Sequence, residues 1–229
     1  MSAGGLRLLA WVNSYAWGVW DLRTGDELFS GSSPGTSGSA DRSGQLVVWS
    51  DGSKLWTVRV SDGHVVARRG GLSAGAVSPD GVVAASRMDG SLTFLDERTL
   101  RPDGRALSDA PGTIEQFAFS GDGSLLAARG SDGNVRLIDM TNRAQVGGPI
   151  VVNGEGDRTI AFRRDGRALA EPSRNGVLIW DLRPATWVIA ACQLAGRELS
   201  RQEWQTYLAA SGDYQRTCPK AADADSRRP

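Results

Sequence analysis

The sequence predicts an all-β fold of repeated antiparallel units, followed by a short segment of two helices. A hydrophobic-Asp pair recurs along the chain, and tight-turn dipeptides divide the sequence between these pairs into short apolar stretches. After residue 183 this pattern stops, and the apolar residues follow a helical spacing instead. These three observations define the fold class and the order of its parts.

The hydrophobic-Asp pair sets the length of the repeat. Clear copies are Trp20-Asp21, Leu95-Asp96, Ile138-Asp139 and Trp180-Asp181, and Val60-Ser61 is a fainter copy between the first two. Successive hydrophobic members of these five pairs are 40, 35, 43 and 42 residues apart. A period near forty residues is typical of the four-stranded blade of a β-propeller.

Turn dipeptides place the strands within each unit. Asp-Gly, which tolerates positive φ and suits tight hairpins, occurs eight times. The stretches between these turns are rich in Val, Leu, Ile and Ala, which predicts an antiparallel meander. The predicted blades cover approximately residues 1–30, 36–70, 73–109, 113–152 and 158–183. The first and last of them are incomplete, because each offers only three strands.

Three units share one pattern of residues. FAFSGDGSLLAARGSDGNVRLIDM (117–140) aligns with AVSPDGVVAASRMDGSLTFLDE (76–97) and with IAFRRDGRALAEPSRNGVLIWDL (160–182). On these motifs, residues 6–183 resemble the WD-repeat family, which implies a β-propeller of about five blades whose terminal blades are incomplete.

The same resemblance implies a structural hydrogen bond from a turn aspartate to the histidine of a Gly-His dipeptide. Asp89 and Asp132 occupy the turn position. The Gly-His element is missing from the loops that join the units, because the only histidine, His64, lies in a hairpin turn. Strand packing therefore has to supply more of the rigidity.

The C-terminal segment has the signals of two helices. Pro184 suits a first helical turn, apolar residues from Trp187 to Leu194 share one helical face, and Gly196 predicts the end of the first helix. Ser200 and Glu203 form a capping box that begins a second helix over about 201–210. The sequence thus predicts a helical cap at 184–219, and the polar residues 220–229 predict a disordered tail.

The amino-acid sequence of this cap shows a second resemblance. WVIAACQLAGRELSRQEWQTYLAASGDYQRTCP (187–219) is similar to the C-terminal cap of many bacterial WD-repeat proteins. Those proteins often carry signalling ATPase domains of the STAND type. The resemblance implies that this chain is the C-terminal sensor part of a split or truncated signalling ATPase, as an alternative to an independent scaffold.

The only two cysteines, Cys192 and Cys218, both lie in the cap. One interpretation is a disulfide that joins the first helix to the tail. The other is a pair of reduced thiols, which a reducing cytoplasm favours.

Composition and motifs exclude several classes of function. Lys plus Arg equals Asp plus Glu at 26 each, which argues against a large nucleic-acid or anionic-membrane footprint. No secretory signal or long apolar segment is evident, so we expect a cytoplasmic protein that spans no membrane. A single histidine and the lack of a GxxxxGK[ST] loop predict no enzyme activity, no metal site and no cofactor.

Arginines define one candidate partner-binding face. Arg87, Arg129 and Arg174 fall at or just before the second turn of three successive units. In WD-repeat proteins this turn lies on a face that often contacts partners, so a basic ring there would suit acidic peptides. The alternative is solvated arginines at strand ends with no partner.

The leading functional hypothesis is a non-enzymatic protein–protein interaction scaffold. Rings of this family usually hold seven blades, whereas five are visible here, and open sheet edges invite pairing with other chains. Closure of five blades, self-association, or completion by another chain would each solve this problem. We expect an incomplete ring that depends on self-association or on a partner.

Overall fold

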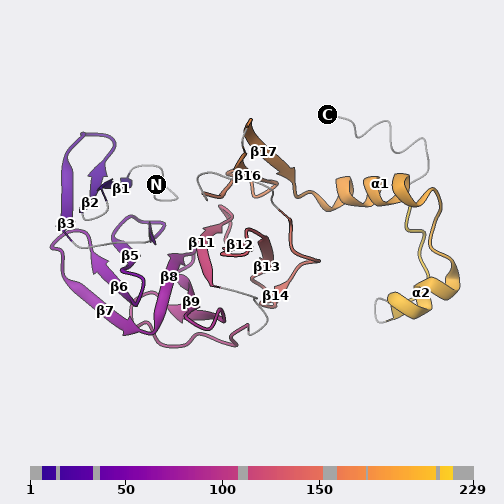
Figure 1. Cartoon of the computed structure of the whole chain (residues 1–229), viewed down its shortest axis with the longest axis horizontal. Helices are drawn as coiled ribbons and strands as arrows, with labels where there is room; N and C mark the ends of the chain where they lie inside the picture. Colours follow the sequence, from indigo (N-terminus) through magenta and orange to yellow (C-terminus); the bar gives the residue numbers. More distant parts are fainter. Residues whose placement is uncertain are drawn as a thin grey trace. The chain divides into compact units, whose positions relative to one another are not determined.

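The computed structural model of the chain describes residues 7–13, 16–32, 37–107, 113–151, 159–173, 175–209 and 212–218. Their main elements are five antiparallel sheets and two short helices (Figure 1). The fold is therefore mostly β, as the sequence predicts. Contacts between Cα atoms divide the chain into two compact units, residues 1–179 and 180–229.

Each sheet contains strands that follow one another in the chain and pair antiparallel. The strands of the five sheets are, in order, β1 (Arg7–Asn13), β2 (Ala16–Asp21) and β3 (Glu27–Ser32); β4 (Ser37–Ala40), β5 (Leu46–Ser50), β6 (Lys54–Arg59) and β7 (Val65–Gly70); β8 (Leu72–Val77), β9 (Val82–Arg87) and β10 (Leu92–Asp96); β11 (Ile114–Phe119), β12 (Leu125–Gly130), β13 (Val135–Asp139) and β14 (Ala144–Gln145); and β15 (Ala161–Phe162), β16 (Ala168–Ser173) and β17 (Gly176–Asp181). The clear hydrophobic-Asp pairs of the repeat lie at the ends of β2, β10, β13 and β17.

The fourth strand of a unit is the least regular. The third sheet has only three strands, and where the fourth strand of the predicted blade would lie the chain makes isolated bridges instead, between Leu92 and Leu107 and between Leu95 and Pro102. Pro102 has no backbone N–H to donate, which interrupts the ladder. In the fourth sheet, β14 has two residues and is followed only by the Val135–Ile150 bridge. The prediction of full fourth strands was wrong at these two places.

Apolar clusters join the first four sheets in chain order. Trp17 and Val19 of the first sheet pack with Val47 and Trp49 of the second, where the Trp17 and Trp49 ring centroids are 5.8 Å apart. The second and third sheets share a second cluster, and the third and fourth share another that contains Phe94. Small side chains allow this close approach, since a Cβ at Gly75 would lie 2.7 Å from Cδ1 of Leu55. The core is therefore a series of layers between neighbouring sheets.

The first strands of neighbouring sheets also lie side by side. Contacts join β4 to β8, β8 to β11, and β11 to β15. Four of these first strands and the turns that follow them line a hollow of about 450 Å³, whose wall includes Ser39, Ala76, Phe117 and Phe162. Contacts among the described residues connect the sheets in chain order and do not show a closed ring.

The C-terminal unit contains both helices. The helix α1 (Pro184–Ala195) begins with a proline and ends at Gly196, whose φ of 65° is left-handed. The helix α2 (Arg201–Tyr207) begins at Ser200, where the capping box with Glu203 is fully formed. Both predicted helix starts are confirmed, but α2 ends earlier than predicted. The predicted disordered tail at 220–229 lies outside the described residues.

No described helix of the chain combines the length and the apolar character needed to cross a membrane.

Candidate partner-binding surfaces

The repeated aspartates at the ends of third strands build turns. Oδ1 of Asp96 accepts hydrogen bonds from the backbone N–H of Arg98 and Thr99 and from the Thr99 hydroxyl, the last at 2.7 Å. The Thr99 hydroxyl is the largest cause that lowers the pKa of Asp96. Asp21, Asp139 and Asp181 likewise accept from the N–H two residues later. These positions are therefore structural in the described fold.

The hydrophobic partners of these aspartates differ in their burial. Leu95 is buried in the cluster between the second and third sheets and Ile138 in the cluster between the third and fourth. Trp20 and Trp180 are only partly buried. The two tryptophans lie in the first and the fifth sheet, at the two ends of the series. The repeat positions thus have their full core role only in the middle sheets.

The turn aspartates that the family resemblance singles out are bound by other groups than histidine. Oδ1 of Asp89 accepts from the backbone N–H and the hydroxyl of Ser91. Asp132 binds the guanidinium of Arg136 through both carboxylate oxygens, with the shorter distance 2.6 Å, and this is the largest cause that lowers its pKa. Arg136 is itself buried, so this ion pair is a structural contact within the fourth sheet. No local motif in the sequence marks Arg136 as the partner of Asp132.

The three arginines of the predicted ring do not have similar surroundings. Arg87 is exposed at the end of β9, and Arg174 lies outside the described residues. Arg129 is buried: its Nη1 lies 2.7 Å from Oε1 of Glu171, and the two side chains are 4% and 0% exposed. Arg129 is thus a link between the fourth and fifth sheets, and its proposed place on an exposed partner-binding face was wrong. Arg129 is buried because it pairs with Glu171, the acidic residue of the otherwise largely apolar strand β16, 42 residues later in the sequence.

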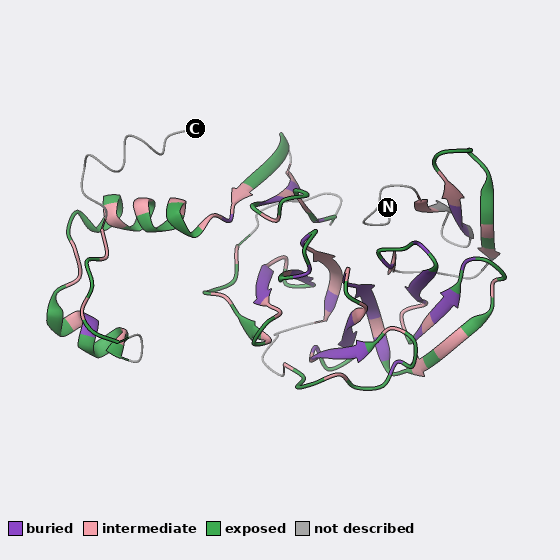
Figure 2. Ribbon diagram, turned by 180° about the vertical axis from the view of Figure 1, so that it is seen from behind, coloured by how far each residue is buried: buried purple, intermediate pink, exposed green. Residues whose placement is uncertain are grey.

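The strand β17 is the most exposed apolar surface of the fifth sheet. Side chains two positions before the repeat aspartate are buried in three sheets, with exposed fractions of 0% for Val19, 0% for Phe94 and 3% for Leu137. The equivalent Ile179 is 72% exposed. Its neighbours Val177 and Leu178 are also exposed, and Figure 2 shows most of β17 in green.

This strand is also an edge. In the described order of the fifth sheet, β17 pairs only with β16, and the chain continues from Asp181 into α1 rather than into a fourth strand. Among the described strands of the fifth sheet, β17 therefore combines an edge position with exposed apolar side chains. Single exposed apolar residues are normal on protein surfaces, whereas a continuous exposed apolar strand at a sheet edge is a feature that many association sites share.

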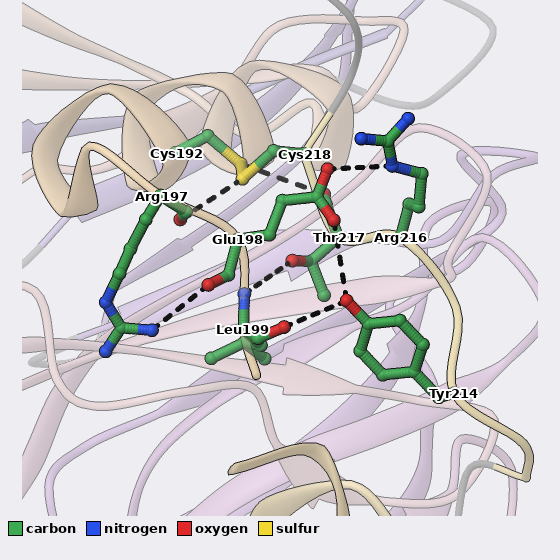
Figure 3. The surroundings of a disulfide bond; sticks show 8 residues. All are labelled: Cys192, Arg197, Glu198, Leu199, Tyr214, Arg216, Thr217 and Cys218. Carbon is green, nitrogen blue, oxygen red and sulfur yellow. Dashed lines mark hydrogen bonds and ion pairs between the residues drawn. A yellow bond between two sulfur atoms is a disulfide. The ribbon is translucent and has the colours of Figure 1, made fainter. Parts of the chain in front are cut away.

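The two cysteines form a disulfide in the C-terminal unit (Figure 3). Cys192 of α1 and Cys218 are bonded with their Cα atoms 5.6 Å apart. The preference for reduced thiols was therefore wrong in this structure. The chain returns to the helix because residues before Cys218 bind the segment between the helices: the Tyr214 hydroxyl donates to the Leu199 carbonyl at 3.0 Å, and Nε of Arg216 donates to Glu198 at 2.9 Å.

Among the residues that the structure describes, no group of three or more His, Cys, Asp or Glu side chains is placed to hold a metal ion.

The sequence was also compared with known proteins. No protein-family model matches the chain, and no curated protein is similar enough to count as a relative.

Proposed function

We propose that the chain is a non-enzymatic protein–protein interaction module with blades of the WD-repeat type, and that the exposed strand β17 is where another polypeptide docks. The observation that carries the proposal is the exposure of Ile179 at a position that is buried in the first, third and fourth sheets. A sheet supplied by a partner would cover Ile179 as the fourth sheet covers Phe94.

The order of the sheets supports a propeller-like arrangement. The first four sheets pack on one another in chain order, and the first strands of the second to fifth sheets line one hollow. In a propeller, the first strands of the blades surround the central channel. In an incomplete ring, the two end blades each lack a neighbour on one side. The fifth sheet has the exposure expected of an end blade.

The free energy gained on docking can be estimated from the apolar side chains of β17 that a partner would bury. Complete burial of an aliphatic side chain is worth about 1.5–3 kcal/mol. Scaled by their exposed fractions of 64%, 41% and 72%, Val177, Leu178 and Ile179 offer together about 3–5 kcal/mol to a partner that covers them. Hydrogen bonds to the free edge of β17 would add to this and would fix the register.

The test compares two charge substitutions at exposed apolar positions. Ile179→Lys places a charge on the proposed docking strand, and Leu22→Lys is the matched control in a turn of the first sheet, where the side chain is 46% exposed. Both variants should keep the melting temperature of the wild type, because neither side chain is in the core. Light scattering and native co-purification are then measured for all three proteins.

We expect Ile179→Lys to abolish association while Leu22→Lys retains it. A larger particle formed by the purified wild type alone would identify a second copy as the partner. A wild-type monomer that retains a co-purified protein, with that protein lost only from Ile179→Lys, would identify a separate partner. If wild type and Ile179→Lys behave alike in both measurements, β17 is not a docking strand.

A further inference from the structure

A pocket of about 320 Å³ opens between the third and fourth sheets, away from β17. Its floor is apolar and includes Leu92, Ile114 and Ile138, which belong to the cluster that joins the two sheets. Three arginines, Arg105, Arg136 and Arg143, stand around this floor. The volume falls in the range of small-molecule sites, which commonly combine apolar walls with a few convergent polar groups.

The backbone of Arg143 is unusual. Its φ is 51°, in the left-handed region that only glycine adopts at little cost. The equivalent position in the first sheet, four residues after the repeat aspartate, is Gly25 with φ of 81°. At the same position of the third sheet, Leu100 has φ of 50°, and its buried side chain explains why the turn keeps a leucine. Burial of an apolar side chain does not explain why a non-glycine residue occupies this left-handed position at Arg143.

The side chain of Arg143 is held across the gap between the sheets. Its guanidinium lies over the Phe94 ring, with Cζ 4.8 Å from the ring centroid, and Nη2 lies 2.7 Å from Oδ2 of Asp103. A Cβ at position 104 would collide with this guanidinium, so Gly104 leaves the space it needs. A strained residue thus places an arginine at the pocket, and strain of this kind tends to collect at binding sites.

The charges around the pocket favour an anion. Arg136 is paired with Asp132, and Arg143 is paired with Asp103. Arg105 is exposed at the rim. Of these five charged groups three are positive and two are negative, which leaves one positive charge in excess. Guanidinium groups bind carboxylates through charge-assisted hydrogen bonds.

We propose that this pocket binds a small organic carboxylate with an apolar body, whose chain lies on Leu92, Ile114 and Ile138 and whose carboxylate meets Arg105 and Arg143. The polar end gives orientation, and the apolar body gives most of the buried area. This site is independent of the proposed docking strand, since none of its residues belongs to the fifth sheet.

The test uses octanoate as the probe and isothermal titration calorimetry of the full chain as the measurement. Octan-1-ol has the apolar body without the charge, and acetate has the charge without the body. We expect octanoate to bind at least tenfold more tightly than either, because both halves of the pocket are then used.

Two variants locate the binding. Arg143→Gly removes the guanidinium and also suits the left-handed backbone, so we expect a folded protein with affinity for octanoate reduced about 10- to 100-fold, as for a lost charged hydrogen bond. Arg105→Gln changes only an exposed rim residue and should reduce the affinity about tenfold. Arg23→Ala, in the equivalent turn of the first sheet, is the matched control and should bind as the wild type does.

The proposal is overturned if octanoate binds no more tightly than octan-1-ol, or if Arg105→Gln and Arg23→Ala retain the same affinity. Because Arg105 is exposed, that second result stands even if Arg143→Gly lowers stability.

Discussion

Replacement of Arg129 by methionine should destabilise the chain far more than replacement of any exposed arginine. The substitution keeps most of the apolar volume but removes the guanidinium that lies 2.7 Å from Glu171. The substitution therefore removes a cation in direct contact with Glu171, whose side chain is 0% exposed and depends on such contacts to compensate for its desolvation. Breaking one side of a buried ion pair typically costs about 3–5 kcal/mol.

A second ion pair in the same chain allows the effect of burial to be separated from the effect of the distance between the charges. Arg59 and Asp62 lie 2.8 Å apart, almost as close, but their side chains are 47% and 49% exposed. Water screens such a pair, so Arg59→Met should cost less than about 1 kcal/mol. The difference between the two variants therefore measures the effect of burial.

Urea denaturation followed by circular dichroism is the assay. With a slope of about 3 kcal/mol per molar urea for a chain of this size, Arg129→Met should lower the midpoint by about 1–1.7 M. The double variant Arg129→Met/Glu171→Leu removes both charges and should recover most of this loss, because an apolar pair of similar volume is often neutral or stabilising. Equal midpoints for Arg129→Met and Arg59→Met would refute the reasoning, as would a double variant less stable than Arg129→Met.

Three further predictions concern turns and the C-terminal unit. Asp96→Ala should cost about 1–2 kcal/mol in urea denaturation and Asp139→Ala less, since Asp96 accepts hydrogen bonds from two backbone N–H groups and the Thr99 hydroxyl, whereas Asp139 accepts from the N–H of Thr141. Equal losses would contradict this assignment. Replacement of both Cys192 and Cys218 by serine should destabilise the C-terminal unit by about 3.5 kcal/mol, the loop-entropy estimate for a separation of 26 residues. Rates of proteolysis of the two proteins test this, and an unchanged rate of cleavage would exclude a stabilising disulfide. The Arg197 side chain and the Ser200 N–H lower the pKa of Glu203 from 4.5 to about 2, so the wild type should be more stable than Glu203→Gln above about pH 4.5 and should lose this advantage as the pH falls through about 2. Urea denaturation at each pH measures the difference in stability between the two proteins, and a difference that stays constant with pH would contradict the prediction.

The sequence predicted the strands well because their signals are local. Asp-Gly turns and the aspartates at strand ends act within a few residues, as the bonds of Asp96 to Arg98 and Thr99 show. The starts of both helices followed from Pro184 and from the capping box of Ser200 and Glu203 for the same reason. Patterns of this range are readable from one sequence.

The errors arose where distant residues decide the outcome. Arg129 looked like a surface arginine beside a turn, and only the arrival of Glu171 from the next sheet makes it a buried structural residue. The exposure of Ile179 could not be read from its strand, which is as apolar as the strands that are buried. The disulfide depends on the return of Cys218 to α1, which the bonds of Tyr214 and its neighbours determine.

The central claim is that another polypeptide covers β17, and accessibility of residue 179 tests it most directly. In the described part of the chain both native cysteines are bonded to each other, so Ile179→Cys introduces the only reactive thiol there. Its rate of alkylation is compared, in native extract and after purification at high dilution, with that of Leu22→Cys. The account predicts slow alkylation of residue 179 in the extract and fast alkylation after dilution, with no change at residue 22. Equally fast alkylation at both positions in the extract would show that nothing docks on β17.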